Sequence, residues 1–477
     1  MIILMIFCYI SNPSDWQLLR NMRVVNSISA GNRYVYFAGE GILRYDKLFQ
    51  KYEVPVSRDA LPLDIKLIQQ DIYTGEVWFT TPKGLGKYTP TFENYKFIDM
   101  NNIAGVCSLG VSDRYIYLRN GNKYIKVDKF SGSSDFTDSV PKQISWEPKN
   151  SPQEYSWLAP WYTMDKSLNR YPVVCSEVDE QFLWVGTSGD GIYKYSAAGF
   201  NLLEHCLYGF PSGRIMSLFK TGDTLWFGAL SEIGNYAIGQ GAFSSYLFSN
   251  TINLLNSEIT AMAFNDKYMW FGSQIGVSQF NKSRNIWYNF IEASDVFSLA
   301  VKGDELWIGT NSGLLKLTNG YMGTVIKNIC VNDVAVCSTV VWIATDRGVF
   351  SLNDTGWVQF NDPDKIMSHG VYRLLFDEYG KWFGAKQGLL VYKKDNNWDR
   401  FNYPTVLPGE RIMCFGTDEN TLYVGTDRGV GVFNKNSKSW NRYDEKNSYM
   451  NGIVYSVVVD KGYVYFGTDN GIVKLKK

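Results

Sequence analysis

The sequence predicts an all-β fold: a β-propeller of eleven four-stranded blades, arranged as two tandem propellers closed by strand exchange. Three observations support this prediction. One short phrase recurs eleven times in the 477 residues, each copy has the pattern of a tight hairpin, and the steps between copies match the length of a blade. Aromatic residues make up 16% of the chain and charged residues 20%, which is typical of a packed β-rich protein.

The recurring phrase is clearest near the end of the chain, as LYVGTDRGVGVFN at 422–434 and VYFGTDNGIVKLK at 464–476. Each copy carries one aromatic residue, here called the anchor, in its apolar strand. The anchors are Tyr36, Trp78, Tyr117, Trp184, Trp226, Trp270, Trp307, Trp342, Trp382, Tyr423 and Tyr465. Successive anchors lie 35 to 44 residues apart, except for one step of 67 between Tyr117 and Trp184. Because no helical period accompanies the repeat, helical and leucine-rich repeats are excluded.

Each copy predicts the two central strands of a blade joined by a tight turn. A glycine follows the anchor by six residues in seven copies, as at Gly429 and Gly471, because such a turn needs a positive φ that a Cβ disfavours. An apolar strand precedes each anchor, as at 453–460. A W-x-x-[FY] signature follows it and marks the fourth strand, as at Trp440 and Tyr443.

The two ends of the chain predict how a ring is closed. The fourth-strand signature falls 15 to 17 residues after the anchor in the clear copies, so after Tyr465 it would lie beyond Lys477. The segment DWQLL at 15–19 is a fourth strand with no blade before it. We therefore expect this N-terminal strand to complete a blade and to cover an otherwise exposed sheet edge.

The division into two units is less clear in the sequence. Rings usually carry four to eight blades, and the repeat is weakest in the glycine-rich stretch 237–251. We therefore expect an N-terminal propeller of about five blades in 13–240 and a C-terminal propeller of about six in 241–477. In this arrangement DWQLL closes the first ring, and the strand around Tyr246 to Phe248 closes the second. A nested arrangement and a single ring are the alternatives.

The long step between Tyr117 and Trp184 contains an insertion, at 141–170, that is rich in proline and aromatic residues. Long loops of this kind are usually functional or disordered, and the aromatic content argues against disorder. We expect it to be a loop that offers a ligand-binding platform, because Trp and Tyr anchor interfaces. The candidate binding residues are Trp146, Tyr155, Trp157, Trp161 and Tyr162. The alternative is that these aromatics pack on the first propeller as a lid.

The N-terminus begins with the apolar run MIILMIFCYI, which is too short to span a bilayer. We interpret 1–12 as a truncated signal segment, with a buried first strand as the alternative. Six cysteines remain outside it, and Cys107, Cys175 and Cys414 fall on the interior strand of their blades, where a small buried thiol packs well. All six are expected to be free thiols, in a periplasmic or extracellular protein.

Charge and motif content disfavour several functions. Lys plus Arg and Asp plus Glu are both 47, so no basic excess favours nucleic acid. The chain has two histidines, His205 and His369, and lacks P-loop, G-x-S-x-G and H-E-x-x-H motifs. We therefore expect no catalytic residue, cofactor or metal site. His205 is interpreted as structural, and the turn aspartates Asp346, Asp427 and Asp469 as turn caps instead of calcium ligands.

The phrase [LV]-W-[FIV]-G-T-x-x-G-[ILV], present over nearly the whole chain, resembles the two-component regulator propeller repeat. This resemblance implies an exported, binding or sensor-type role, with a glycan, peptide or protein partner in the envelope. In the related sensor kinases the propellers precede an immunoglobulin-like domain, a membrane helix and a kinase, none of which follows here. The alternatives are a propeller enzyme, such as a lyase or glycan hydrolase using loop carboxylates, and a structural or assembly protein of the cell envelope.

Overall fold

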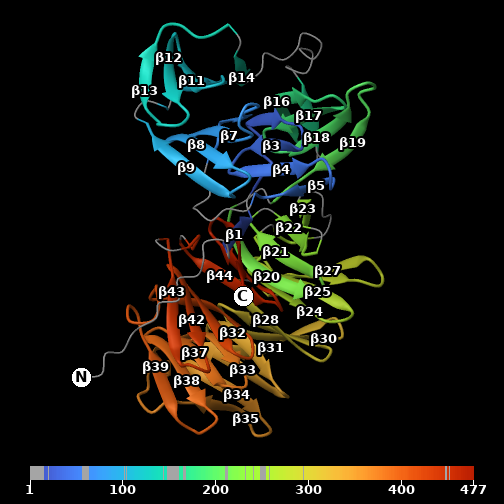
Figure 1. Ribbon diagram of the computed structural model, residues 1–477. Helices are drawn as coiled ribbons and strands as arrows, with labels where there is room; N and C mark the ends of the chain where they lie inside the picture. Colours follow the sequence, from blue (N-terminus) through green and yellow to red (C-terminus); the bar gives the residue numbers. More distant parts are fainter. Residues whose placement is uncertain are drawn as a thin grey trace, which may run out of the picture.

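The computed structural model consists of eleven antiparallel sheets, each containing the four strands of one blade (Figure 1). It describes residues 16–477 except 20, 56–63, 101–102, 104, 143, 148–160, 165–167, 210–212, 231, 240, 248–253, 257, 294, 446–447 and 451. The expected signal segment at 1–12 lies outside these residues. The all-β class and the four-stranded blades are confirmed.

Four sheets form one unit, here called the N-lobe. Its first two blades are β2 (Ser27–Ala30), β3 (Tyr34–Ala38), β4 (Ile42–Asp46), β5 (Lys51–Glu53), and β6 (Leu67–Gln70), β7 (Val77–Thr81), β8 (Gly84–Thr89), β9 (Asn94–Asp99). The third is β10 (Val106–Val111), β11 (Tyr115–Asn120), β12 (Lys123–Asp128), β13 (Ser134–Thr137), with the added strand β14 (Ser145–Glu147). The fourth is β16 (Arg170–Val178), β17 (Phe182–Thr187), β18 (Ile192–Ser196), β19 (Leu202–Cys206), with the added strand β15 (Tyr162–Met164).

The other seven sheets form a unit here called the C-ring. Its first four blades are β20 (Ile215–Thr221), β21 (Thr224–Ala229), β22 (Glu232–Ala237), β23 (Ala242–Leu247); β24 (Ala261–Phe264), β25 (Tyr268–Gly272), β26 (Val277–Asn281), β27 (Ile286–Phe290); β28 (Val296–Lys302), β29 (Glu305–Thr310), β30 (Gly313–Thr318), β31 (Tyr321–Lys327); and β32 (Val331–Cys337), β33 (Val340–Thr345), β34 (Gly348–Asn353), β35 (Gly356–Phe360).

The remaining three blades follow the short 3-10 helix η4 (Met367–His369). They are β36 (Val371–Phe376), β37 (Gly380–Ala385), β38 (Gly388–Lys393), β39 (Trp398–Phe401); β40 (Ile412–Thr417), β41 (Thr421–Thr426), β42 (Gly429–Asn434), β43 (Ser439–Tyr443); and β44 (Val454–Val459), β45 (Tyr463–Thr468), β46 (Gly471–Lys476). The outer strand of the last blade is β1 (Trp16–Leu19).

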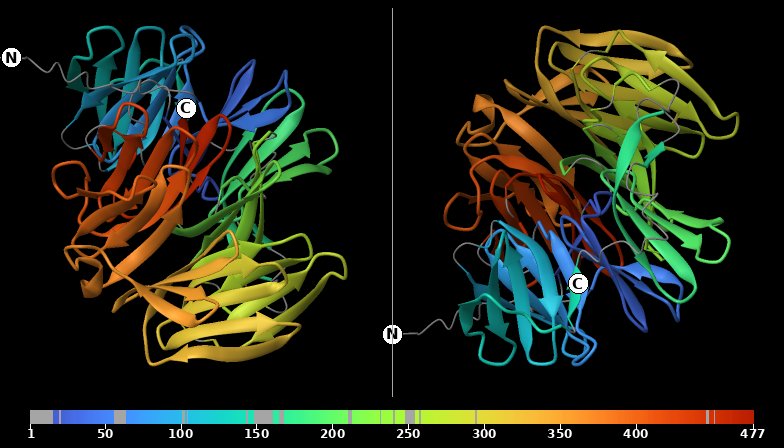
Figure 2. Two further views of the ribbon diagram at one scale, coloured as in Figure 1. Left: turned by 90° about the horizontal axis from the view of Figure 1, so that it is seen from below. Right: turned by 90° about the horizontal axis from the view of Figure 1, so that it is seen from above.

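The inner strands of the C-ring make a closed circle. β20 packs against β24, and the contacts continue through β28, β32, β36, β40 and β44 back to β20. The blades follow one another around this circle in chain order, from green to red (Figure 2). In the N-lobe the inner strands contact one another in the order β10, β6, β2, β16. The chain therefore forms two propeller units, a four-bladed one and a seven-bladed one.

This grouping differs from the expected five and six blades. The sheet β20–β23 packs between β44 and β24, so it belongs to the second unit. The glycine-rich stretch near residue 240 is the turn between β22 and β23, inside one blade, and not a boundary between units. Ala237 pairs with Ala242 across this turn, and the change of unit comes earlier, between β19 and β20.

The strand exchange expected at the termini is confirmed. β1 pairs antiparallel with β46, with Trp16 opposite Leu475 and Leu19 opposite Ile472. The Trp16 ring is buried, 5.0 Å between centroids from the ring of Tyr443. The expectation that DWQLL closes the first ring is wrong, because its partner is the last strand of the C-ring. Likewise, the strand around Tyr246 lies in β23 and pairs with β22 of its own blade.

Because β1 belongs to the C-ring, the chain leaves that ring at residue 21, builds the N-lobe and returns at β20. The outgoing segment bonds to the end of the N-lobe, where the Met22 amide donates to the Tyr208 carbonyl at 3.0 Å. Its Arg23 guanidinium forms a 3.1 Å ion pair with Glu232 of β22, and both side chains are buried. A buried ion pair therefore joins this segment to the C-ring.

Each residue of the G-T-x-x-G phrase has a structural reason. The Thr426 hydroxyl donates to the Gly429 carbonyl at 2.9 Å and accepts the Arg428 amide, so threonine caps the turn. Gly429 has a φ of 127°. A Cβ on Gly425 would lie 2.3 Å from the Cys414 sulfur and 3.0 Å from Val454 of the next blade. The first glycine therefore permits close blade packing, and the second permits the turn.

Threonine, and not the following aspartate, caps these turns. Asp427 accepts the Arg411 amide at 3.1 Å, and Asp469 accepts the Ile453 amide at 3.0 Å; each bond reaches outside the turn of the aspartate itself. The interpretation of these aspartates as caps of their own turns is therefore corrected. Their carboxylates bind the backbone that leads into the inner strand of the same blade.

All six cysteines in the described residues are free, as expected. The Cys175 thiol bonds to the Val25 carbonyl at 3.4 Å and the Cys414 thiol to the Val454 carbonyl at 3.3 Å, both on the segment that leads into or begins the neighbouring blade. Burial raises the pKa of Cys414 to about 12. Cys107 is exposed, because a bulge between Val106 and Ser108 turns it out of the interior face. In the described part of the chain, no helix is long and apolar enough to cross a membrane.

Deleting residues 1–20 should destabilise the C-ring. The deletion removes the buried side chains of Trp16, Leu18 and Leu19 and exposes the edge of β46. Each such side chain contributes about 1.5–3 kcal/mol, so unfolding should lose on the order of 5 kcal/mol. Differential scanning calorimetry with light scattering measures the effect, and a chain that begins at Asp15 is the control. An unchanged melting temperature in a monomeric deletion variant would contradict the closure.

Candidate functional site

The N-lobe has a cavity of about 1050 Å³ on the face that carries the turns between the first and second strands of its blades. Three of these turns line it, at 30–34, 70–75 and 177–182. Further lining comes from the β4–β5 turn, through Lys47 and Gln50, and from Pro90. The cavity is therefore built by three blades, those that begin with β2, β6 and β16.

The charges around this cavity are largely paired with one another. The Lys47 ammonium lies 2.9 Å from Asp179, and the Arg33 guanidinium lies 3.1 Å from Asp46. The buried Asp71 carboxylate is paired at 2.5 Å with Lys129 of the neighbouring blade. Such pairing leaves little net charge to attract an ion. It favours a ligand that is held by neutral hydrogen bonds and apolar contacts.

Two polar atoms of the cavity wall have no hydrogen-bond partner, the Tyr36 hydroxyl and the Gln70 Oε1. Tyr36 is completely buried, and its burial raises the pKa of the phenol, with the nearby Arg44 guanidinium opposing. Tyr36 is the anchor of the first repeat. At the equivalent position of the fourth blade, the Trp184 indole donates to Asp179 at 3.0 Å. Unpaired buried polar atoms cost free energy, and both of these atoms are covered by protein, so they mark unmet hydrogen-bonding capacity beneath the cavity wall.

Lys194 of β18 also lines the cavity, among aromatic rings. Its ammonium donates to the Tyr45 hydroxyl at 2.9 Å and lies 4.1 Å from the Phe182 ring centroid and 5.1 Å from that of Trp184. Burial raises the pKa of Glu204, its cross-strand neighbour, and Lys194 opposes that shift. The lysine holds the rings of two adjacent blades together at the back of the cavity.

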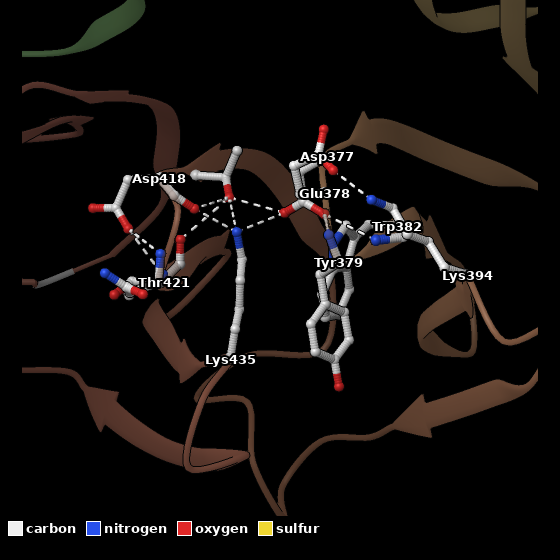
Figure 3. Close-up of polar contacts among 11 residues, drawn as sticks. Asp377, Glu378, Tyr379, Trp382, Lys394, Asp418, Thr421 and Lys435 are labelled. Atoms are coloured by element: carbon white, nitrogen blue, oxygen red, sulfur yellow. Dashed lines mark hydrogen bonds and ion pairs between the residues drawn. The ribbon is translucent and has the colours of Figure 1, made fainter.

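Ion pairs between adjacent blades fix the turns that form this wall, and the sequence analysis missed them. Figure 3 shows an example from the C-ring, in which Lys435 lies between two blades and contacts Asp377 at 2.8 Å. The same aspartate accepts the Trp382 indole at 3.1 Å. In the next blade, Lys477 contacts Asp418 at 2.7 Å. The pattern is an aspartate in the first turn of one blade and a lysine after the third strand of its neighbour.

A weak sequence signal for these pairs exists. Asp179, Asp377 and Asp418 each lie five residues before an anchor, and Lys129, Lys435 and Lys477 each lie twelve residues after one. In the N-lobe the pairs are Asp71 with Lys129 and Asp179 with Lys47. The second of these pairs joins the fourth blade to the first. The cavity wall is therefore held by the same contact that joins successive blades in the C-ring.

The insertion at 141–170 forms two short strands where the sequence indicated a loop. β14 adds to the inner edge of β10, and β15 adds to the inner edge of β16. Trp146 is half-buried on the third blade, and the centroid of its ring is 5.9 Å from that of Tyr124. The ring also covers Gly110, where an added Cβ would lie only 2.9 Å from it. Trp146 thus packs on its blade, as in the lid alternative.

Two other insertion residues are exposed. Trp161 is 53% exposed and Tyr162 43%, and the Arg170 guanidinium lies 4.6 Å from the Tyr162 ring centroid. Tyr155 and Trp157 lie outside the described residues. The structure therefore separates the predicted platform into one packing residue and two residues that are accessible to a partner.

His205 is held by its own blade. Its ring stacks on Tyr193 with centroids 4.0 Å apart, and its Nε2 lies 2.7 Å from the Asp190 carbonyl oxygen. The Tyr193 hydroxyl donates to the Asp190 carboxylate at 2.5 Å. Among the residues that the structure describes, no three His, Cys, Asp or Glu side chains are grouped to hold a metal ion. The structural interpretation of His205 agrees with these contacts.

Neither a protein-family model nor a curated protein sequence matches this chain. Solved structures do resemble it. The extracellular domains of BT4673 and BT3049 of B. thetaiotaomicron, both assigned to hybrid two-component systems, are 13% and 16% identical, each with a TM-score of 0.48. The matches cover 95% of this chain and 70% of BT4673, and 97% of this chain and 83% of BT3049. PorZ, a type-IX secretion component of Porphyromonas gingivalis, is 12% identical with a TM-score of 0.35, over 97% of this chain and 87% of that protein.

Replacing Asp179 with asparagine should destabilise the N-lobe at neutral pH. Burial raises the pKa of Asp179, but the Trp184 indole and the Lys47 ammonium outweigh burial and leave it below the ordinary value. The carboxylate therefore stabilises the fold above the unfolded-state pKa of about 3.9, and this stabilisation disappears as the pH falls through the lower folded-state pKa.

At pH 7 the variant should lose about 1–3 kcal/mol, and the difference from the parent should vanish in strong acid. Thermal unfolding followed from pH 7 down to pH 2 measures both effects. Asp304→Asn is the control, because Asp304 and its partner Lys267 are both exposed. A loss of stability that is the same at every pH would contradict the ion-pair explanation.

Proposed function

We propose that this protein is an exported, non-catalytic binding or sensor-type module, and that its N-lobe recognises a glycan, a peptide or a protein. The observation that carries the proposal is the N-lobe cavity, whose charges are paired internally and whose wall includes the unpartnered Tyr36 hydroxyl and Gln70 Oε1. Both atoms are covered by protein, and once neighbouring side chains uncover them a ligand hydrogen bond would supply a bond that the protein itself leaves unmade. Rigid inter-blade ion pairs keep the cavity preorganised, which lowers the entropic cost of binding.

The insertion supplies a second contact in this proposal. Trp161 and Tyr162 are exposed, and large rings with a polar group are the side chains that most often anchor interfaces. Tyr155 and Trp157 remain candidates from the sequence alone. Trp146 has a different role here, since it holds the inserted strand on the third blade.

A periplasmic or extracellular location is part of the proposal. It is supported by the apolar N-terminal segment and by the resemblance of the blade phrase to the two-component regulator propeller repeat. In that setting the protein would act through ligand binding to the N-lobe, with the C-ring as a rigid support.

Tyr36→Phe tests the proposal with a matched control in the same chain. Tyr465 is the anchor of the last repeat, is equally buried and also has an unpartnered hydroxyl, but lies in the C-ring. Both variants should unfold near the parental melting temperature, since neither hydroxyl makes a well-formed hydrogen bond, although the Arg44 guanidinium lies near that of Tyr36. Binding is screened on an array of oligosaccharides and random peptides. Tyr36→Phe should weaken the bound ligand about tenfold, the equivalent of one hydrogen bond, while Tyr465→Phe should not.

The double variant Trp161→Ala, Tyr162→Ala tests the insertion separately. It should keep its stability and bind more weakly, whereas Trp146→Ala should lower the melting temperature. Absence of any array ligand for the parental protein, or equal weakening by Tyr36→Phe and Tyr465→Phe, would overturn the proposal.

A further inference from the structure

The turns between third and fourth strands differ between the two units of the protein. In the N-lobe these turns carry Phe49, Phe92 and Phe130, which are 63%, 69% and 84% exposed. In the C-ring the same turns read KSRN at 282–285, NG at 319–320, DT at 354–355, KDNN at 394–397 and KNSK at 435–438. The third-to-fourth-strand turns of three N-lobe blades thus carry an exposed phenylalanine, whereas these C-ring turns are polar.

Two of these phenylalanines lie close in the sequence to residues that line the cavity. Phe49 and Leu48 are in the β4–β5 turn whose Lys47 and Gln50 line it, and Phe92 follows the lining residue Pro90 by two positions. On another side, Ile72 lines the cavity and is 79% exposed, and its neighbour Tyr73 is 56% exposed.

Phe130 joins this group through its neighbour in the sequence. The Lys129 ammonium lies 5.3 Å from the Tyr73 ring centroid and pairs with Asp71. We call the six side chains the apolar rim: Leu48, Phe49, Ile72, Tyr73, Phe92 and Phe130. The residues of the apolar rim therefore come from the first three blades of the N-lobe.

The size of the apolar rim is that of a protein-binding surface. All six side chains are more than half exposed, and at roughly 150–250 Å² for a large aromatic residue they offer on the order of 600–900 Å². One partner in a standard protein interface contributes about 800 Å². Contiguous exposed apolar patches beyond a few hundred Å² mark interaction sites on soluble proteins.

The charges on this face point to the kind of partner. Arg33, Lys47, Lys51, Arg114 and Lys129 are each paired with a carboxylate of the protein. Binding to an anionic membrane uses unpaired basic side chains, so the pairing argues against a lipid surface. Leu48 and Ile72 are aliphatic and have no ring face with which to stack on a sugar. A polypeptide with apolar side chains matches both the paired charges and the aliphatic residues of this face.

We propose that the N-lobe cavity and its apolar rim bind a segment of another protein that carries apolar side chains on both sides of a short polar stretch. The apolar side chains would contact the rim. The polar stretch between them would enter the cavity, where a shift of the covering side chains would let Gln70 Oε1 accept a hydrogen bond and the Tyr36 hydroxyl donate or accept one. This inference rests on the proposed function in taking the cavity as the binding site, and it adds the class of partner.

A phage-displayed library of random dodecapeptides is the probe. Peptides selected on the parental protein should contain at least two apolar residues separated by a polar stretch, and synthetic copies give dissociation constants. The triple variant Phe49→Ser, Phe92→Ser, Phe130→Ser should weaken these peptides at least tenfold and unfold at the parental temperature. The control is Ile275→Ser, Ile291→Ser, Tyr321→Ser, three exposed apolar residues of the C-ring, which should bind like the parent.

The same variants also distinguish a polypeptide ligand from an oligosaccharide or a membrane surface. An oligosaccharide that is weakened by Tyr36→Phe but not by the triple variant would overturn the polypeptide inference while leaving the proposed function intact. Rim-dependent binding to phosphatidylglycerol vesicles would overturn it in favour of a membrane. Failure to enrich any peptide over an empty support, or peptides that bind the triple variant equally well, would also overturn it.

Discussion

The pairing of β1 with β46 is the interaction on which the rest of the architecture depends. It completes the last blade of the C-ring with the first strand of the chain, so the two ends of a ring that contains residues 215 to 476 are held by backbone hydrogen bonds. It also places the whole N-lobe between two strands of the other unit. The segment after β1 and the segment before β20 must therefore lie close together, which explains the buried Arg23–Glu232 pair at this junction.

Within each unit, one arrangement of contacts between blades is used repeatedly. A glycine on the second strand lets the next inner strand approach. At the point where the ring closes, a Cβ on Gly467 would lie 2.8 Å from the Ile215 carbonyl oxygen. At the edge of the sheet, an aspartate in the first turn of a blade binds a lysine of its neighbour, as for Asp377 and Lys435 (Figure 3). In the N-lobe the equivalent pair is Asp179 and Lys47, and both residues line the cavity. The site therefore depends on the contact that joins the blades.

The sequence predicted what lies inside a blade better than what lies between blades. Strand order, hairpin turns and the closing strand at Trp16 depend on local alternation and turn chemistry, which a single repeat contains. The grouping into four and seven blades depends on which inner strands pack together, and no single repeat contains that information. The glycine-rich turn near residue 240 therefore resembled a boundary. Cys107 was placed in the interior for a similar reason, since a one-residue bulge changes the face on which a side chain lies.

The candidate site was only partly predictable. The insertion was visible as an excess of aromatic residues, but burial of Trp146 and exposure of Trp161 depend on which strand edge each short strand joins. The cavity is formed by turns far apart in the chain, and its unpartnered Tyr36 hydroxyl is a property of packing. The apolar rim had a sequence signal, since phenylalanine follows the third strand in the N-lobe and polar residues do so in most C-ring blades.

Cysteine cross-linking of β1 tests the nested arrangement most directly. Gln17 and Lys474 lie opposite each other on paired antiparallel strands, where Cα atoms are close enough for a disulfide. Gln17→Cys with Lys474→Cys should therefore form a disulfide on mild oxidation, identified by mass spectrometry of the linked peptides. The control is the double variant Gln17→Cys with Asn235→Cys, which would be linked if the N-terminal strand instead paired with β22. This control should form no disulfide, because β22 already pairs with β23. A disulfide in the second variant and none in the first would contradict the closure of the C-ring by the N-terminal strand.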